Sequence, residues 1–377
     1  MIRLSPGMRL SPRALASLLL AAAFLFAGCQ PKELTSAKIY IQNRNWEKAL
    51  EQLEQAVKLY PENAEAHFWL GGTYGIFGRY KEMNREFDLS LQFSDKYREQ
   101  INAEREKHWI RQYNSGVTAM SHKRYREAER ALKTAILIAP EKDDAYRRLA
   151  VNYLRLDQPE QALMLYNKLL EKHPDDLELL SSVANLYYSE SRFQEAVDVL
   201  HHMLQLEPDH RDALANLALC YDSMGRVEDA TQAYTRAIAA NPLDKDLIFL
   251  FGVHNYKQKK YERAIELFQQ VLDIDPDEFE STSNIGNTYL SIAERLKKSL
   301  KSSNKELASQ EKIMSLKQRA IQNYKNAISY LEKALQIQPN HPELWRNLGV
   351  AYINVGEREK GHQAFLKSEE LKVHLSN

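Results

Sequence analysis

The two cysteines carry the most reactive side chains in this sequence of 377 residues, and they stand in different settings. Cys29 ends the stretch LFAGC after an apolar run, whereas Cys220 stands beside Tyr221 in a segment of helix-forming residues. A thiol can be acylated, oxidised or buried, and its surroundings decide among these. We expect Cys220 to be a small buried hydrophobe rather than a reactive thiol. The chemistry of Cys29 depends on the residues before it.

Residues 1–28 have the layout of a secretory signal. Their only charges are Arg3, Arg9 and Arg13, and a run of 13 mostly apolar residues follows at 14–26. A helix that crosses a bilayer needs about 20 such residues, so this run is too short to span one. A basic start, a short apolar centre and small residues at the end predict a signal that is removed from the mature protein.

The residues at the end of this segment, Ala27, Gly28 and Cys29, resemble the cysteine box of bacterial lipoproteins, with Phe26 where that pattern prefers leucine. The resemblance implies that the Cys29 thiol is acylated with fatty acids such as palmitate, and that Cys29 becomes the first residue of the mature chain. Gln30 follows it, and the absence of aspartate there favours the outer membrane. Two alternatives are an ordinary signal peptide with an incidental cysteine and an uncleaved anchor.

No other set of residues has the types and spacing of a catalytic or metal site. The sequence lacks a phosphate-binding loop, a nucleophile elbow and a zinc-binding cysteine pattern. His201, His202 and His210 lie close in sequence, but adjacent residues of a helix point in different directions, so we expect separate surface histidines. The 51 basic and 51 acidic residues balance, whereas nucleic-acid binding normally requires a basic face. We therefore predict no enzyme activity, no cofactor, no metal and no nucleic-acid partner.

A period of 34 residues organises the middle of the chain. It is marked by Pro140, Pro174, Pro208, Pro242 and Pro276. An alanine stands twelve residues before each of these prolines, and a large apolar residue stands eight before. These intervals place both residues on one face of a helix, which the proline then ends. A fixed period of this length is typical of stacked helical repeats.

The upstream half of each period predicts another helix with a similar face. A small residue, such as Ala150, Ala184 or Gly252, stands among large apolar ones, so a neighbouring helix can approach closely. Turn residues such as Gly225 separate the two helices. The pattern resembles the tetratricopeptide repeat over nearly the whole chain after residue 28. The resemblance implies an all-α fold: a right-handed α-solenoid of about nine helix pairs, with a concave groove lined by the first helix of each pair.

The solenoid is predicted to span residues 29–375. Its repeats are expected near residues 30–63, 64–97, 109–142, 143–176, 177–210, 211–244, 245–278, 279–341 and 342–375. Eleven extra residues precede the third repeat, about three helical turns, so helices here can lengthen without rotating their buried face. In the ninth repeat, Gly361 replaces the usual alanine, which favours a less stable last helix.

The eighth repeat contains an insertion near 293–321. We expect both of its helices to be extended by about four turns, roughly 20 Å, to form a projecting hairpin. Leu296, Leu300 and Leu307 form an apolar stripe, and residues 303–306 match a capping box. Its lysines would meet anionic lipid headgroups or an acidic partner; the alternative is a solvated helical extension.

The resemblance also implies which positions of each first helix line the groove. The predicted partner-binding residues are Tyr113, Val117, Arg147, Val151, Leu154, Asn185, Tyr188, Asn216, Leu219, Phe249, Val253 and Tyr256. An apolar and aromatic stripe inside a groove open to solvent indicates a binding surface. Arg147 at the rim would orient an acidic partner. The alternative is that these side chains simply pack between helices.

These patterns predict a non-enzymatic scaffold for protein–protein interaction, lipid-anchored in the bacterial envelope at the outer membrane and facing the periplasm. Its groove would hold a peptide or helix of an envelope protein, in envelope, pilus or secretion assembly. Lipoproteins of this architecture include pilotins of type IV pili and helpers of outer-membrane or cell-wall assembly. The alternatives are an enzyme or ligand-binding protein with a composite site on the solenoid, and a cytosolic adaptor if residues 1–28 are not a signal.

Overall fold

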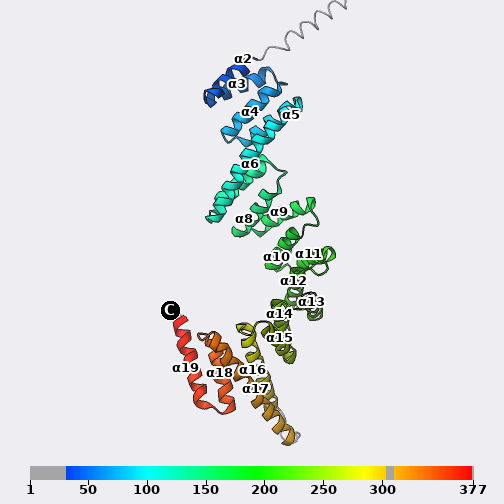
Figure 1. The fold of residues 1–377 in the computed structure, drawn as a ribbon, viewed down its shortest axis with the longest axis vertical. Helices are drawn as coiled ribbons and strands as arrows, with labels where there is room; N and C mark the ends of the chain where they lie inside the picture. Colours follow the sequence, from blue (N-terminus) through cyan, green and yellow to red (C-terminus); the bar gives the residue numbers. More distant parts are fainter. Residues whose placement is uncertain (1–30, 303–309, 376–377) are drawn as a thin grey trace, which may run out of the picture. The chain divides into compact units, whose positions relative to one another are not determined.

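The computed structural model describes residues 31–302 and 310–375, which form α-helices and one short 3₁₀ helix and contain no β-strand (Figure 1). The all-α prediction is therefore confirmed for these ranges. The predicted signal at 1–28, Cys29, the capping box at 303–306 and Leu307 lie outside the described residues. The chain divides into two compact units, and the division falls between Pro174 and Asp175.

Each unit consists of helices that pair in chain order, each first helix packing against the helix that follows it. The first unit contains α2 (Lys32–Gln42), α3 (Trp46–Leu59), α4 (Ala64–Ile76), α5 (Tyr80–Phe93), η1 (Asp95–Tyr97), α6 (Arg98–Ser121), α7 (Tyr125–Ile138), α8 (Asp143–Arg155) and α9 (Pro159–Lys172). The second unit contains α10 (Leu177–Ser189), α11 (Phe193–Leu206), α12 (Arg211–Ser223), α13 (Val227–Ala240), α14 (Lys245–Lys257), α15 (Tyr261–Ile274), α16 (Phe279–Ser302), α17 (Gln310–Ile337), α18 (Pro342–Val355) and α19 (Arg358–Leu375). Among the helices of the described residues, none is both long and apolar enough to span a bilayer.

The residues that carry the 34-residue period are the ones that the helices bury. All five alanines that stand twelve residues before a proline are fully buried, and the large residues four positions later are buried as well: Leu132, Tyr166, Leu200, Tyr234 and Phe268. Each of the five prolines lies two residues after the end of its helix, where it blocks any continuation. The predicted role of the period is confirmed.

The turns between paired helices need a residue in the left-handed region. Gly225 has a φ of 70°, as its predicted turn role requires. The same place is filled by non-glycine residues in neighbouring repeats, including Lys123, Asp157, Ser191 and Lys259, with φ between 57° and 59°. A side chain in this region costs about 1–2 kcal/mol. The geometry of the turn is thus set by the packed helix pair rather than by glycine alone.

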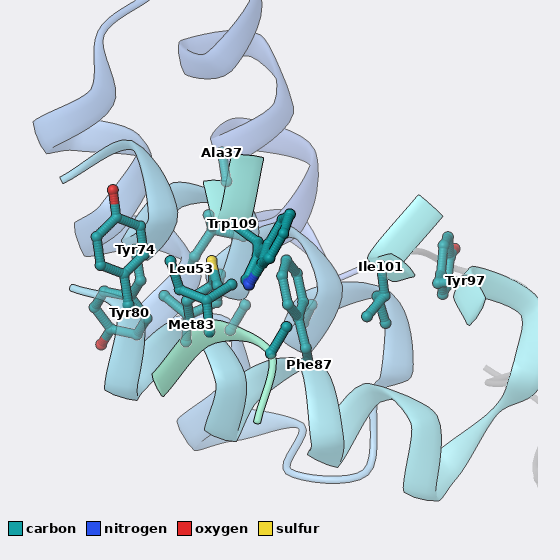
Figure 2. Close-up of a cluster of buried hydrophobic side chains, with 14 of the residues drawn as sticks. Ala37, Leu53, Tyr74, Tyr80, Met83, Phe87, Tyr97, Ile101 and Trp109 are labelled. Atoms are coloured by element: carbon teal, nitrogen blue, oxygen red, sulfur yellow. The ribbon is translucent and has the colours of Figure 1, made fainter. Parts of the chain in front are cut away.

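The eleven extra residues before the third repeat belong to one long helix, α6, which has 24 residues. Its added first turns bury Ile101, and Trp109 at the start of the third repeat is also buried (Figure 2). Both join the core cluster that contains Phe87 and Met83 of α5. Because Gly116 and Ala119 further along α6 are also buried, the helix lengthens without rotating its buried face, as the sequence predicts.

The eighth repeat holds two long helices, α16 with 24 residues and α17 with 28, whereas the helices of the preceding repeat have 13 and 14. Ile292, Leu296 and Ala320 pack together along the extension. The hydroxyl of Tyr324 donates to Glu294 Oε1 at 2.5 Å and so bridges the two helices. The extended hairpin is therefore confirmed for the described turns.

Gly361 of the last pair fits a close approach of α18 and α19. A Cβ atom at Gly361 would lie 2.8 Å from Ile353 and 3.2 Å from the carbonyl oxygen of Gly349, so an alanine would force the helices apart. Glycine lowers the helix propensity of α19 at this position, but it leaves the space that the close approach of α18 requires.

Candidate functional site

In the first unit, the predicted groove residues lie on α6 and α8, the first helices of neighbouring pairs. Tyr113 stacks on Trp109 with ring centroids 4.8 Å apart, and its hydroxyl accepts a hydrogen bond from Arg148 Nε at 3.4 Å. Val117, Arg147 and Val151 are half-buried. Leu154 is 39% exposed, which is high for a leucine on a packed helix.

In the second unit, Asn185 and Asn216 form a polar link between the first helices α10 and α12. The amide of Asn216 donates to Asn185 Oδ1 at 2.9 Å. Tyr188 follows on α10 and is 36% exposed, with its hydroxyl 3.5 Å from Ser223 Oγ of α12. Leu219 of α12 is half-buried. The two asparagines are thus hydrogen-bonded to each other. Among the predicted residues on α10 and α12, Tyr188 is the exposed aromatic side chain.

The other predicted residues of this unit, Phe249, Val253 and Tyr256 on α14, are also only half-buried. They pack against the cluster that includes Ala264, Phe268 and Ile285, and the Tyr256 hydroxyl lies 3.0 Å from Ser291 Oγ. The alternative of packing between helices therefore accounts for part of their apolar surface. Since they support the helix interface, they are poor positions for testing a partner contact.

A recessed site that sequence reasoning missed lies in the first unit. A cleft of about 220 Å³ is lined by Ile41, Trp46, Phe68, Trp69, Gly72, Thr73, Ile76, Glu104 and Lys107. Gly72 faces open space, and Ile76 is 45% exposed. Phe68 and Gly72 hold the places in the repeat at 64–97 that the predicted groove residues Tyr113 and Val117 hold in the repeat at 109–142. The same positions, examined in the earlier repeat, would have found them.

A second missed cleft, of about 750 Å³, lies among α17, α18 and α19. Leu335, Trp345 and Leu348 supply apolar walls, and the indole of Trp345 donates to the carbonyl of Pro339 at 2.7 Å. Lys360 and Lys367 stand at the polar side. Glu332 also lines this cleft and accepts a hydrogen bond from the Tyr352 hydroxyl, which ties α17 to α18.

A buried chain of polar residues in the second unit superficially resembles a catalytic triad. His254 Nδ1 lies 2.6 Å from Asp222 Oδ1, and His254 Nε2 lies 2.9 Å from Thr231 Oγ1. The Thr231 hydroxyl, however, donates its one hydrogen to the carbonyl of Val227 at 2.8 Å. His254 is fully buried, so a substrate has no access to it. These contacts hold α12, α13 and α14 together.

The pKa values of two buried histidines in the first unit, His67 and His108, are shifted in opposite directions. Burial alone would lower the pKa of His67, but its hydrogen bonds to Glu86 at 2.6 Å and to the carbonyl of Pro61 at 2.9 Å outweigh this and raise the pKa. Burial lowers the pKa of His108, and neither of its ring nitrogens has a hydrogen-bond partner in the described structure. Both side chains serve the interior rather than a surface site.

The histidines and the thiol that the sequence singled out have separate structural roles. His201 Nε2 lies 3.0 Å from the Tyr221 hydroxyl, His202 pairs with Asp175 at 3.1 Å, and His210 caps the first turn of α12. Within the described residues, no group of three acidic, histidine or cysteine side chains is placed to hold a metal. Cys220 is fully buried, and burial raises its pKa to about 11, which confirms the prediction of an inert thiol.

Comparison with known families fits this arrangement. A tetratricopeptide repeat model matches residues 119–186, 187–248 and 320–367, and two further models of this repeat match 221–279 and 37–75. The chain belongs to the tetratricopeptide repeat family. Members of this family are typically non-enzymatic scaffolds. The chain is accordingly a tetratricopeptide repeat scaffold for protein–protein interaction.

Two curated proteins are similar in sequence to this tetratricopeptide repeat protein over part of their length. The mouse BBSome complex member BBS4 is 22% identical over 343 residues, which cover 91% of this chain and 58% of the relative. Human tetratricopeptide repeat protein 8 is 38% identical over 74 residues, 20% of this chain and 14% of the relative. The chain thus spans little more than half the length of the first of these relatives and much less of the second.

Solved structures with similar helix pairs include a tetratricopeptide repeat protein from Parabacteroides merdae. It has a TM-score of 0.47 and 16% identity, with 70% of this chain and 93% of that one covered. The PilF protein of Pseudomonas aeruginosa has a TM-score of 0.43 and 18% identity, with 64% and 96% covered.

Proposed function

We propose that this protein is a non-enzymatic scaffold of the bacterial envelope, anchored by fatty acids on Cys29 and facing the periplasm from the outer membrane. Its first helices capture a peptide or helix of another envelope protein. Capture is supported above all by apolar side chains that stay partly open on first helices in both units, namely Leu154 and Tyr188. Arg147 next to Val151 on α8 suits a partner with acidic residues beside its apolar ones.

The anchor is supported by the sequence of residues 1–30 alone. One fatty acid holds a protein to a bilayer only marginally, whereas two or three hold it stably, so an acylated Cys29 would keep the scaffold at a membrane. Mass spectrometry of the protein purified from its native membrane tests this part. We expect an N-terminal peptide that begins at an acylated Cys29. An unmodified peptide containing Met1 or Met8 would rule out the anchor and favour a cytosolic adaptor.

Surface substitutions test the groove. Leu154→Glu and Tyr188→Glu place charges where an apolar partner segment would lie, and each should reduce capture of an envelope protein by about tenfold or more, because a buried unpaired carboxylate is strongly unfavourable. Met164→Glu and Leu243→Glu are matched controls, since these side chains are 71% and 79% exposed but do not lie on first helices. Equal capture by both sets would contradict the groove assignment.

A further inference from the structure

The insertion in the eighth repeat contributes residues to a basic cleft. The volume of this cleft is about 490 Å³, and it is lined by Lys259, Tyr261, Glu294, Arg295, Lys297 and Lys298. Lys259 and Tyr261 come from the turn between α14 and α15 and from the start of α15. The other four residues lie on α16 beyond Ser291, where a first helix of 13 residues would already have ended.

The cleft is strongly basic in a chain whose 51 basic and 51 acidic residues balance. Four of its six lining residues are cations. The one lining carboxylate, Glu294, is engaged by the hydroxyl of Tyr324 at 2.5 Å. A second carboxylate, Glu262, approaches Arg295 only to 3.6 Å. The four lining cations therefore outnumber these two carboxylates.

Two neighbouring contacts hold cations of the cleft in place. The guanidinium of Arg295 lies over the ring of Tyr261, 5.0 Å from its centre. The ammonium of Lys297 donates to Asn354 Oδ1 of α18 at 2.6 Å. A cation that is already oriented loses less conformational entropy when it binds an anion. Both contacts are to neutral groups, so they leave the charge itself available.

The geometry points to a phosphate group as the ligand: we propose that this cleft binds phosphate, carried either by the headgroup of an anionic phospholipid or by a small soluble phosphate compound. A carboxylate offers two oxygens in one plane and a single charge. A phosphate group offers oxygens in a tetrahedral arrangement, so cations reaching it from a turn and from a helix can bind it together. A phosphate monoester or pyrophosphate also carries two or more charges, whereas the phosphodiester of a lipid headgroup carries one. This inference is independent of the proposed groove, which involves other residues.

Calorimetric titration of the full-length protein with pyrophosphate at low salt tests the cleft. Lys259→Gln combined with Lys298→Gln removes two exposed cations from it, and we expect binding to weaken by about tenfold or more. Lys317→Gln combined with Lys325→Gln removes the same charge from exposed positions of α17 outside the cleft and should change binding less than about twofold. Unchanged helicity by circular dichroism shows that the variants are folded.

Vesicles identify the source of the phosphate. The same full-length proteins are mixed with vesicles of phosphatidylcholine alone or with three parts in ten of phosphatidylglycerol. Extra binding to phosphatidylglycerol that disappears in the Lys259 and Lys298 variant assigns the site to a lipid headgroup. Pyrophosphate binding without that extra binding assigns it to a soluble phosphate compound. The proposal is overturned if neither probe binds, if the variant binds like the wild type, or if a polyglutamate peptide binds as tightly as pyrophosphate.

Discussion

The two long first helices, α6 and α16, have the same length of 24 residues but use their extra turns differently. The extra turns of α6 lie at its start, where Ile101 joins a core with residues of α4 and α5. Those of α16 lie at its end, where they meet α17 and place Arg295 and Lys298 in a basic cleft. An insertion of about three turns preserves the buried face of either helix, but the neighbours it reaches decide whether it becomes core or surface.

The largest expected effect is a difference in the loss of unfolding free energy between substitutions in the extension of α6 and in that of α16. Ile101→Ala removes a fully buried side chain from α6 and should cost about 3 kcal/mol of unfolding free energy, because it leaves a cavity. Leu300→Ala removes a half-buried side chain from α16 and should cost less than about 1 kcal/mol. Urea unfolding followed by circular dichroism measures both. Similar losses of unfolding free energy for the two variants would contradict the view that the α6 extension is core and the α16 extension is surface.

A smaller, pH-dependent effect concerns the buried face of α6. The lowered pKa of His108 means that the unfolded chain binds more protons below about pH 6.5, so His108 reduces stability as the pH falls. His108→Leu also removes two unpartnered ring nitrogens and should stabilise the first unit by about 1 kcal/mol. This gain should grow between pH 7 and pH 5 in urea titrations.

His67 provides the opposite control within the same unit. Its raised pKa means that its contribution is fully present below about pH 6.5 and is lost as the pH rises through the higher folded-state value. His67→Gln should therefore cost more stability at pH 5.5 than at pH 8. The same pH trend for the His67 and His108 variants would show that their buried environments do not differ as described.

The most local effect tests the polar bridge of the α16 extension. Tyr324→Phe removes the hydroxyl that donates to Glu294 and should cost about 1 kcal/mol or slightly more, since the acceptor is charged. Faster hydrogen exchange should be confined to the last turns of α16 and the facing turns of α17. Exchange that instead spreads through α14 and α15 would show that the extension is part of the main core.

The sequence predicts the regular parts of the fold well because each repeat buries the same positions against the next helix pair. The prolines, the alanines and the large residues at fixed intervals determine helix ends and buried faces without reference to distant contacts. For residues 98–108 the sequence predicts that helices can lengthen but assigns these residues to no repeat, because the contacts of Ile101 with its core cluster form only in the folded chain.

The candidate site could be predicted only in part. Groove positions follow from the repeat, so the sequence predicts Leu154 and Tyr188 as partner-binding residues, but their exposure depends on how each neighbouring helix packs. Phe249 and Tyr256 lose part of their surface to the helices around Phe268 and Ser291. The basic cleft joins Lys259 to Arg295 across two repeats, and no local pattern reveals such a pairing.

Site-specific photocrosslinking in living cells tests the central claim most directly. A photoreactive residue is placed at Leu154 or Tyr188 and, as controls, at Met164 or Leu243. The account predicts that the two first-helix positions crosslink to the same envelope protein and that the controls do not. Crosslinks to that protein from the controls alone, or from all four positions equally, would contradict the assignment of the first helices as the partner-binding surface.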